Sequence, residues 1–119
     1  MENKIAFVTG GSRGLGKDMA LAIANKGIDV VLTYKTNQAE AEKTVEEIKK
    51  KGQKAASLFL DMSDIKSLDT FIAQLKTTLQ STWGKDTFDY LIIIISMGMF
   101  IFVIIHPITI IPNFMFVIN

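Results

Sequence analysis

Cysteine is absent from this sequence of 119 residues, and histidine occurs once, as His106. Without cysteine the chain can form neither a disulfide nor a metal site built from thiolates, which excludes the disulfide-stabilised secreted domains. No secretory hydrophobic segment follows Met1, because the chain passes through three polar residues directly into its first apolar run. We therefore expect a cytoplasmic protein without a metal centre.

An excess of charge of either sign is also lacking. Lysine and arginine total 13 against 12 aspartate and glutamate residues, so the balance gives no sign of nucleic-acid binding. All of these charged residues lie at or before Asp89, and none occurs from Tyr90 to Asn119. This change of composition is as sharp as a domain boundary. We divide the chain into residues 1–92 and an uncharged apolar tail, residues 93–119.

The charged part of the chain alternates short apolar runs with amphipathic segments. Apolar runs predict buried strands of a parallel sheet, and apolar residues at helical spacing predict helices that cover the sheet. Asn37 and Ser63 are the expected N-caps of two helices, and Gly84 is the expected end of the third. The expected strands are Ile5–Val8, Ile28–Thr33, Ala55–Leu60 and a fourth from Phe88, and the expected helices run from the first glycines to Lys26, from Gln38 to Lys51 and from Ser63 to Gly84.

This order of elements predicts an α/β fold. Crossover connections through helices give parallel strands and are almost always right-handed. We expect the first half of a doubly wound, Rossmann-type parallel sheet with the strand order 3-2-1-4. The third helix should turn an apolar face toward this sheet, made of Ile65, Leu68, Ile72, Leu75 and Leu79.

A glycine-rich turn, Thr9 to Gly16, joins the first strand to the first helix. The first turn of a helix leaves backbone N–H groups unpaired, and the helix dipole adds partial positive charge at the same place. Gly10, Gly14 and Gly16 lack a Cβ, so the backbone can turn tightly and approach a pyrophosphate closely. The sequence therefore predicts a phosphate-binding turn.

Three stretches together resemble the short-chain dehydrogenase/reductase family: Thr9 to Gly16, Asp61 after the third strand, and Phe88 to Ile92. The glycine spacing, with three residues between the first two glycines, is that of the family. The resemblance covers Lys4 to Ile92 and implies hydride transfer between a nicotinamide cofactor and a carbonyl or alcohol substrate, as in ketone and 3-oxoacyl reductases. It also implies that the cofactor is bound by Gly10, Ser12, Arg13, Gly14, Leu15 and Gly16, with Asp61 at the adenine amino group and Met62 beside the ring.

The end of the second strand predicts which nicotinamide cofactor is bound. An acidic residue there would accept hydrogen bonds from the adenosine ribose and repel a 2′-phosphate. This chain has the neutral Tyr34 followed by Lys35, with Arg13 across the glycine loop. Two cations suit a phosphate, which Arg can bind with paired donors. We therefore expect NADP(H) to be preferred over NAD(H).

The acid–base centre of the family has no counterpart in this chain. The family uses a tyrosine with a lysine four residues later, and neither Tyr34 nor Tyr90 has that partner. After Ile92 the family has Asn-Asn-Ala-Gly, whereas this chain has Ile93, Ile94, Ile95 and Ser96. The branched isoleucines should crowd the cofactor ribose. We expect no catalytic residue and no activity of the chain alone. The alternative is a non-catalytic nucleotide-binding fragment, tethered to a membrane through residues 91–111.

The uncharged tail leaves three interpretations open. It is a degenerate or wrongly read continuation of the coding sequence, a buried or associating strand, or a membrane segment that runs to Ile111. Since the family's later strands are missing, we expect the fourth strand to be an open sheet edge. The chain should then self-associate or aggregate through that edge and the tail, and a cut after Leu91 should improve solubility.

Overall fold

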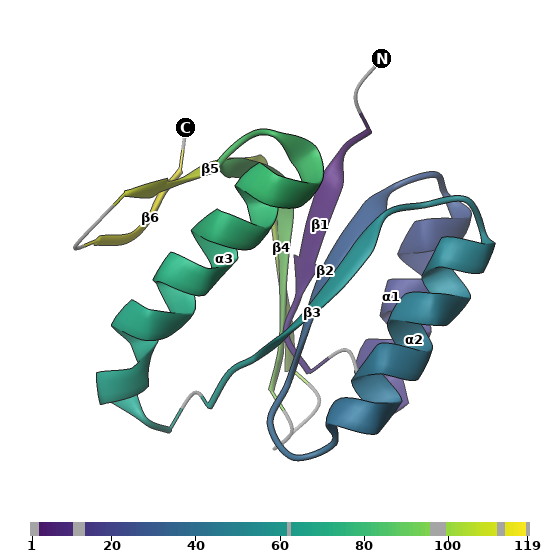
Figure 1. Ribbon diagram of the computed structural model, residues 1–119, viewed down its shortest axis with the longest axis horizontal. Coiled ribbons are helices and arrows are strands. Elements are labelled where there is room, and N and C mark those ends of the chain that lie inside the picture. Colours follow the sequence, from purple (N-terminus) through teal and green to yellow (C-terminus); the bar gives the residue numbers. More distant parts are fainter. Residues whose placement is uncertain (1–2, 11–13, 62, 96–99, 112–113, 119) are drawn as a thin grey trace.

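The computed structural model of the chain describes residues 3–10, 14–61, 63–95, 100–111 and 114–118. A central sheet separates two helical layers (Figure 1). Helices α1 (Gly14–Asn25) and α2 (Gln38–Lys50) cover one face, and α3 (Leu68–Trp83) covers the other. Within the described residues, no helix is long and apolar enough to cross a membrane.

Four strands of the sheet are parallel, in the order β3-β2-β1-β4. Their bounds are β1 (Ile5–Val8), β2 (Asp29–Tyr34), β3 (Ala55–Phe59) and β4 (Thr87–Ile95). The predicted Rossmann-type order 3-2-1-4 is confirmed. Strand β1 lies between β2 and β4. The crossover through α1 places β2 on one side of β1, and the crossover from β3 through α3 brings β4 to the other side.

The expectation that the fourth strand is an open sheet edge is wrong. Strands β5 (Phe100–Ile111) and β6 (Phe114–Ile118) extend the sheet, and β5 pairs antiparallel with β4 from Thr87↔Thr109 to Ile95↔Phe100. Strand β6 pairs antiparallel with β5 in turn. A nearby strand can return antiparallel through a short connection, whereas a parallel partner needs a long crossover. The free edge on this side of the sheet is therefore β6.

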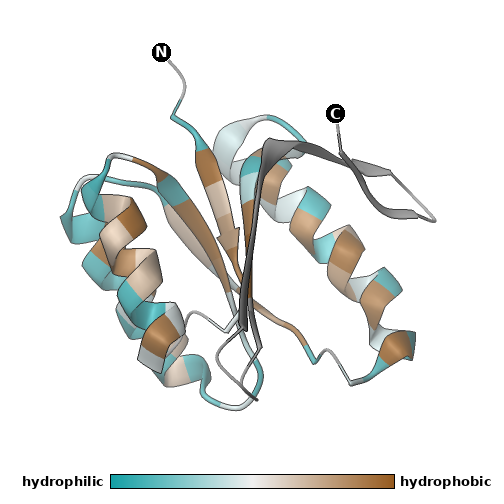
Figure 2. Cartoon of the chain, turned by 180° about the vertical axis from the view of Figure 1, so that it is seen from behind, coloured by the Kyte–Doolittle hydropathy of each residue, from teal (hydrophilic) through white to brown (hydrophobic). Residues whose placement is uncertain are grey.

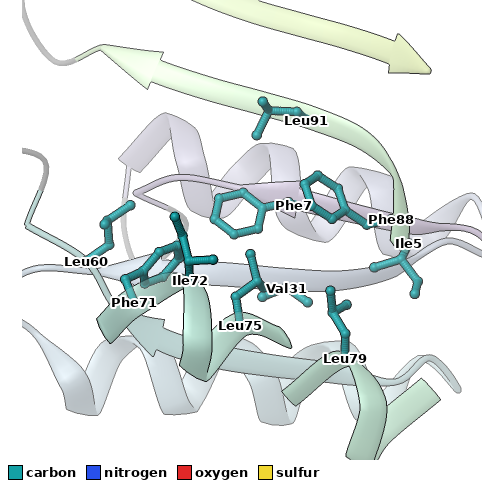
Figure 3. Close-up of a cluster of buried hydrophobic side chains, with 10 residues drawn as sticks. All are labelled: Ile5, Phe7, Val31, Leu60, Phe71, Ile72, Leu75, Leu79, Phe88 and Leu91. Atoms are coloured by element: carbon teal, nitrogen blue, oxygen red, sulfur yellow. The ribbon is translucent and has the colours of Figure 1, made fainter. Parts of the chain in front are cut away.

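Three aromatic rings pack among aliphatic side chains in the core between α3 and the sheet (Figure 3). The Phe7 ring stacks on Phe88 at a centroid distance of 5.4 Å and meets the edge of Phe71 at 5.9 Å. Leu75 and Leu79 of α3 are fully buried against the same group. In Figure 2, which shows the chain from behind, the central strands are coloured largely as hydrophobic residues, whereas hydrophobic and hydrophilic residues alternate along the helices.

The start of the third helix differs from the prediction. Ser63 is not its cap: a short 3-10 turn (Ile65–Ser67) begins after Asp64, whose carboxylate accepts a hydrogen bond from the Lys66 N–H, and α3 follows. Ile65 was expected in the core but is 79% exposed, because it lies in this turn and not on the buried face of α3. The other helix ends agree with the prediction. Asn37 Oδ1 accepts a hydrogen bond from Glu40 N at 3.1 Å, and Gly84 ends α3 with a φ of 74°.

Candidate functional site

The carboxyl ends of β1, β2, β3 and β4 lie at one edge of the sheet, the lower edge in Figure 1. The chain order reverses here, since β2 lies on one side of β1 and β4 on the other. In open parallel sheets a ligand binds outside the strand ends at such a reversal. The predicted cofactor residues belong to the segments that leave this edge.

The glycine turn leaves β1 at this edge. Thr9 N donates a hydrogen bond to Ile92 O of β4 at 3.0 Å, which fixes the start of the turn to the neighbouring strand. Gly10 and Gly14 have φ values of 67° and 61°, a backbone conformation that favours glycine. Among the described residues, no heavy atom lies within 4 Å of a Cβ built at either position. A backbone without Cβ atoms in this conformation suits a phosphate that approaches it closely.

The first turn of α1 contains no acidic residue. Its unpaired N–H groups and the positive end of the helix dipole can therefore act on an anion without a competing carboxylate from the same turn. Gly16 is buried within the helix, whereas the predicted Leu15 is 42% exposed. The predicted residues Ser12 and Arg13 lie outside the described residues.

Thr33 contributes to this turn, and the sequence prediction missed it. Gly10 N donates a hydrogen bond to Thr33 Oγ1 at 3.0 Å, and the threonine is 3% exposed. The hydroxyl therefore joins the first glycine of the turn to the last part of β2. The only sign of this role in the sequence is that Thr33 places a hydroxyl at the end of an apolar run, one residue before the strand ends. Its partner became apparent only when β1 and β2 paired.

Two of the residues predicted to select the cofactor, Tyr34 and Lys35, lie at the end of β2, and Asp61, predicted to contact the adenine, lies beyond the end of β3. Tyr34 is the last residue of β2, half-buried, and its ring meets the edge of Phe59 at a centroid distance of 6.1 Å. Lys35 Nζ lies 3.7 Å from Asp61 Oδ1, and the lysine side chain is 60% exposed. The structure thus brings Lys35 and Asp61 together, which the sequence did not predict. Met62 lies outside the described residues.

Ser63 orients the Asp61 carboxylate. The hydroxyl of Ser63 donates to Asp61 Oδ1 at 2.6 Å, and the backbone N–H of Ser63 donates to the same oxygen at 3.0 Å. The hydroxyl and then the N–H lower the pKa of Asp61 below its ordinary value, and the Lys35 ammonium lowers it further. The side chain therefore stays ionised at neutral pH. Ser63, expected to be a helix cap, instead supports a predicted cofactor residue.

The two tyrosines lie apart in the described structure. Tyr34 ends β2, whereas Tyr90 lies within β4 opposite Ala6, with Lys4 Nζ 5.9 Å from the centroid of its ring. Lys4 is at the amino end of β1, far along the strand from the glycine turn. The carboxyl edge thus offers groups for binding and orienting a dinucleotide. Tyr34 lies at that edge and is followed directly by Lys35, but neither tyrosine has a lysine four residues later.

Comparison with known proteins agrees with this geometry. The family model described as short chain dehydrogenase matches residues 4–92. The "Short-chain dehydrogenase/reductase homolog YusS" of Bacillus subtilis is 40% identical over 76 residues, which cover 64% of this chain and 70% of YusS. A trihydroxynaphthalene reductase of Colletotrichum orbiculare is 34% identical over 82 residues, which cover 69% of this chain and 28% of that enzyme.

Solved structures show the same likeness. The ketoreductase LanV, whose structure contains NADP and rabelomycin, superposes with a TM-score of 0.71 at 29% identity, over 76% of this chain and 37% of LanV. The reductase LugOII gives a TM-score of 0.70 at 31% identity, over 76% of this chain and 36% of LugOII. The chain thus spans about a third of the length of these reductases. It belongs to the short-chain dehydrogenase family and corresponds to the N-terminal, NAD(P)-binding portion of its ketoreductase relatives.

Proposed function

We propose that this chain is the NADP(H)-binding portion of a short-chain reductase that transfers hydride between NADPH and a carbonyl or alcohol. The observation that carries the proposal is the turn with positive φ at Gly10 and Gly14, which leads into a helix without acidic residues in its first turn. A cytoplasmic location and a small ketone or 3-oxoacyl substrate of the complete enzyme belong to the same proposal.

The described residues fit the parts of the cofactor. NADPH supplies the hydride when it is bound. The N–H groups at the start of α1 would bind the pyrophosphate, and Lys35 would bind the 2′-phosphate as an exposed cation at the end of β2. The family resemblance assigns Asp61 to the adenine amino group and adds Arg13 and Met62 from the undescribed part of the turn and loop. The NADP in the LanV structure supports the choice of the phosphorylated cofactor.

NADPH should bind more tightly than NADH, and Lys35→Asp should reduce this preference by about 1–3 kcal/mol, the range for hydrogen bonds to charged groups. The reason is that the substitution replaces a cation near the 2′-phosphate by an anion. Isothermal titration calorimetry with both cofactors measures the effect. Lys26→Asp is the control, since it makes the same charge change beyond the far end of α1, at the opposite edge of the sheet. Equal affinities for the two cofactors in the unmodified chain would contradict the proposal.

The chain alone should show no carbonyl reductase turnover. Neither Tyr34 nor Tyr90 has a lysine four residues later, and a general acid requires a positioned donor of suitable pKa. The measurement follows NADPH consumption with a panel of ketones, using rigorously purified protein. Turnover that copurifies with the chain would show that a proton donor had been overlooked. Nucleotide binding without turnover is also the result expected of the second candidate, a non-catalytic nucleotide-binding fragment.

A further inference from the structure

One oxygen of Asp61 holds three contacts. Oδ1 accepts the Ser63 hydroxyl at 2.6 Å and the Ser63 N–H at 3.0 Å, and it lies 3.7 Å from Lys35 Nζ. All three contacts fall on Oδ1. The carboxylate is therefore held by Ser63 in a position where its charge acts on Lys35.

Two anionic groups would compete for the Lys35 ammonium at the end of β2. The proposed 2′-phosphate and the Asp61 carboxylate would both attract the same ammonium, and they would repel each other. The Lys35 side chain is 60% exposed and that of Asp61 is 24% exposed, so water screens this ion pair and it is weak enough to be exchanged. A carboxylate fixed by Ser63 cannot move away from an arriving phosphate without losing two hydrogen bonds.

We infer that Asp61 is a specificity-determining residue that opposes the 2′-phosphate, by pairing with Lys35 and by its own negative charge, and that Ser63 positions it for this role. This inference rests on the proposed nucleotide-binding function. It gives Asp61 an effect on cofactor choice beyond contact with the base. Lys35 favours the phosphorylated cofactor, and Asp61 limits how strongly it does so.

The experiment compares 2′,5′-ADP with 5′-AMP, which share the adenine and the 5′-phosphate and differ in the 2′-phosphate. The readout is the ratio of their dissociation constants, because loss of a contact with the base affects both ligands alike. Asp61→Asn should shift the ratio about three- to tenfold in favour of 2′,5′-ADP, the scale of one screened charge at a protein surface. Asparagine retains an oxygen that can accept the Ser63 hydrogen bonds.

Asp64→Asn is the matched control. It removes one carboxylate charge three residues away, from an exposed side chain whose described contact is with the Lys66 N–H. The ratio should stay unchanged in this variant. On a Lys35→Ala background, Asp61→Asn should shift the ratio less than it does in the unmodified chain, because part of its effect acts through Lys35.

The outcomes distinguish a failure of the proposed nucleotide-binding function from a failure of the role inferred for Asp61. If neither nucleotide binds the unmodified chain, the proposed function fails and this inference fails with it. If both nucleotides bind but Asp61→Asn leaves the ratio unchanged, or Asp64→Asn shifts it equally, the inference alone is overturned. Ser63→Ala gives a further readout. This variant keeps the charge of Asp61 but removes the hydroxyl that positions the carboxylate, so the ratio of the two dissociation constants should change. Ser63→Thr retains a hydroxyl at this position and should keep the ratio of the unmodified chain.

Discussion

Replacement of Asp29 by alanine should lower the free energy of unfolding by about 3 kcal/mol, the scale for breaking a buried polar network. Asp29 begins β2 and is 1% exposed. Its Oδ1 accepts hydrogen bonds from Asn3 Nδ2 at 3.2 Å, Gln53 Nε2 at 2.9 Å and Lys54 N at 2.9 Å, and its Oδ2 accepts one from Trp83 Nε1 at 2.8 Å. One carboxylate thus joins the segments before β1 and β3 to the end of α3.

Urea denaturation of the variants measures this effect. Trp83→Phe removes a single donor and should cost about 1 kcal/mol, the usual contribution of one hydrogen bond. Asp89→Ala is the control, since the described contact of that carboxylate is one hydrogen bond from Ile5 N at 2.9 Å. A loss below 1 kcal/mol for Asp29→Ala would show that water replaces the carboxylate without cost. Asp29 lies at the amino edge of the sheet, so nucleotide affinity of the folded variant should be unchanged.

Removal of residues 93–119 should change the chain from a self-associating species to a monomer. The removed part carries no charged residue, and it includes β6, the free edge beyond β5. The edge that its removal uncovers, residues 87–92 of β4, carries the charged Asp89. Uncharged edge strands pair readily with other chains, because nothing on them opposes a new backbone ladder. The shortened chain keeps every charged residue of the protein.

The structure places the cut one residue later than the sequence suggested. A cut after Leu91 would remove Ile92, which is buried, pairs with Val8 and accepts a hydrogen bond from Thr9 N. A cut after Ile92 retains all pairing between β1 and β4. Size-exclusion chromatography with light scattering, without detergent, compares the two shortened chains with the full one. Phe116→Lys in the full chain, which adds one charge to β6, should reduce association in part. A full chain that elutes as a monodisperse monomer would contradict the prediction.

Local patterns in the sequence were sufficient to predict most of the elements. The apolar run at Ile5–Val8 and the helical spacing of Leu75 and Leu79 depend on residues close together in the chain, and each was found as predicted. The cap at Asn37 and the turn at Gly84 are equally local. The strand order followed from the alternation of these elements, because right-handed crossovers leave few other arrangements.

The third helix shows where a local pattern was insufficient. Ser63 and Ile65 have the residue types of a helix cap and a core position, but the turn at Asp64 begins before the helix does. The hydroxyl that could have capped a helix is bonded to Asp61 instead. Serine is common near helix starts, but its hydroxyl bonds whichever acceptor lies within reach, and for Ser63 that acceptor is the Asp61 carboxylate.

The sequence by itself determined the helices, the parallel strands, the glycine turn and the family. Only the tertiary structure decided three contacts between groups far apart in the sequence: the Gly10 N–H with the Thr33 hydroxyl, Lys35 with Asp61, and Trp83 with Asp29. It also decided that β5 covers the edge of β4. The physical reason is range. Periodicity and turn chemistry act over a few neighbouring residues, whereas the three contacts join groups more than twenty residues apart, which meet only after the sheet has brought their strands together.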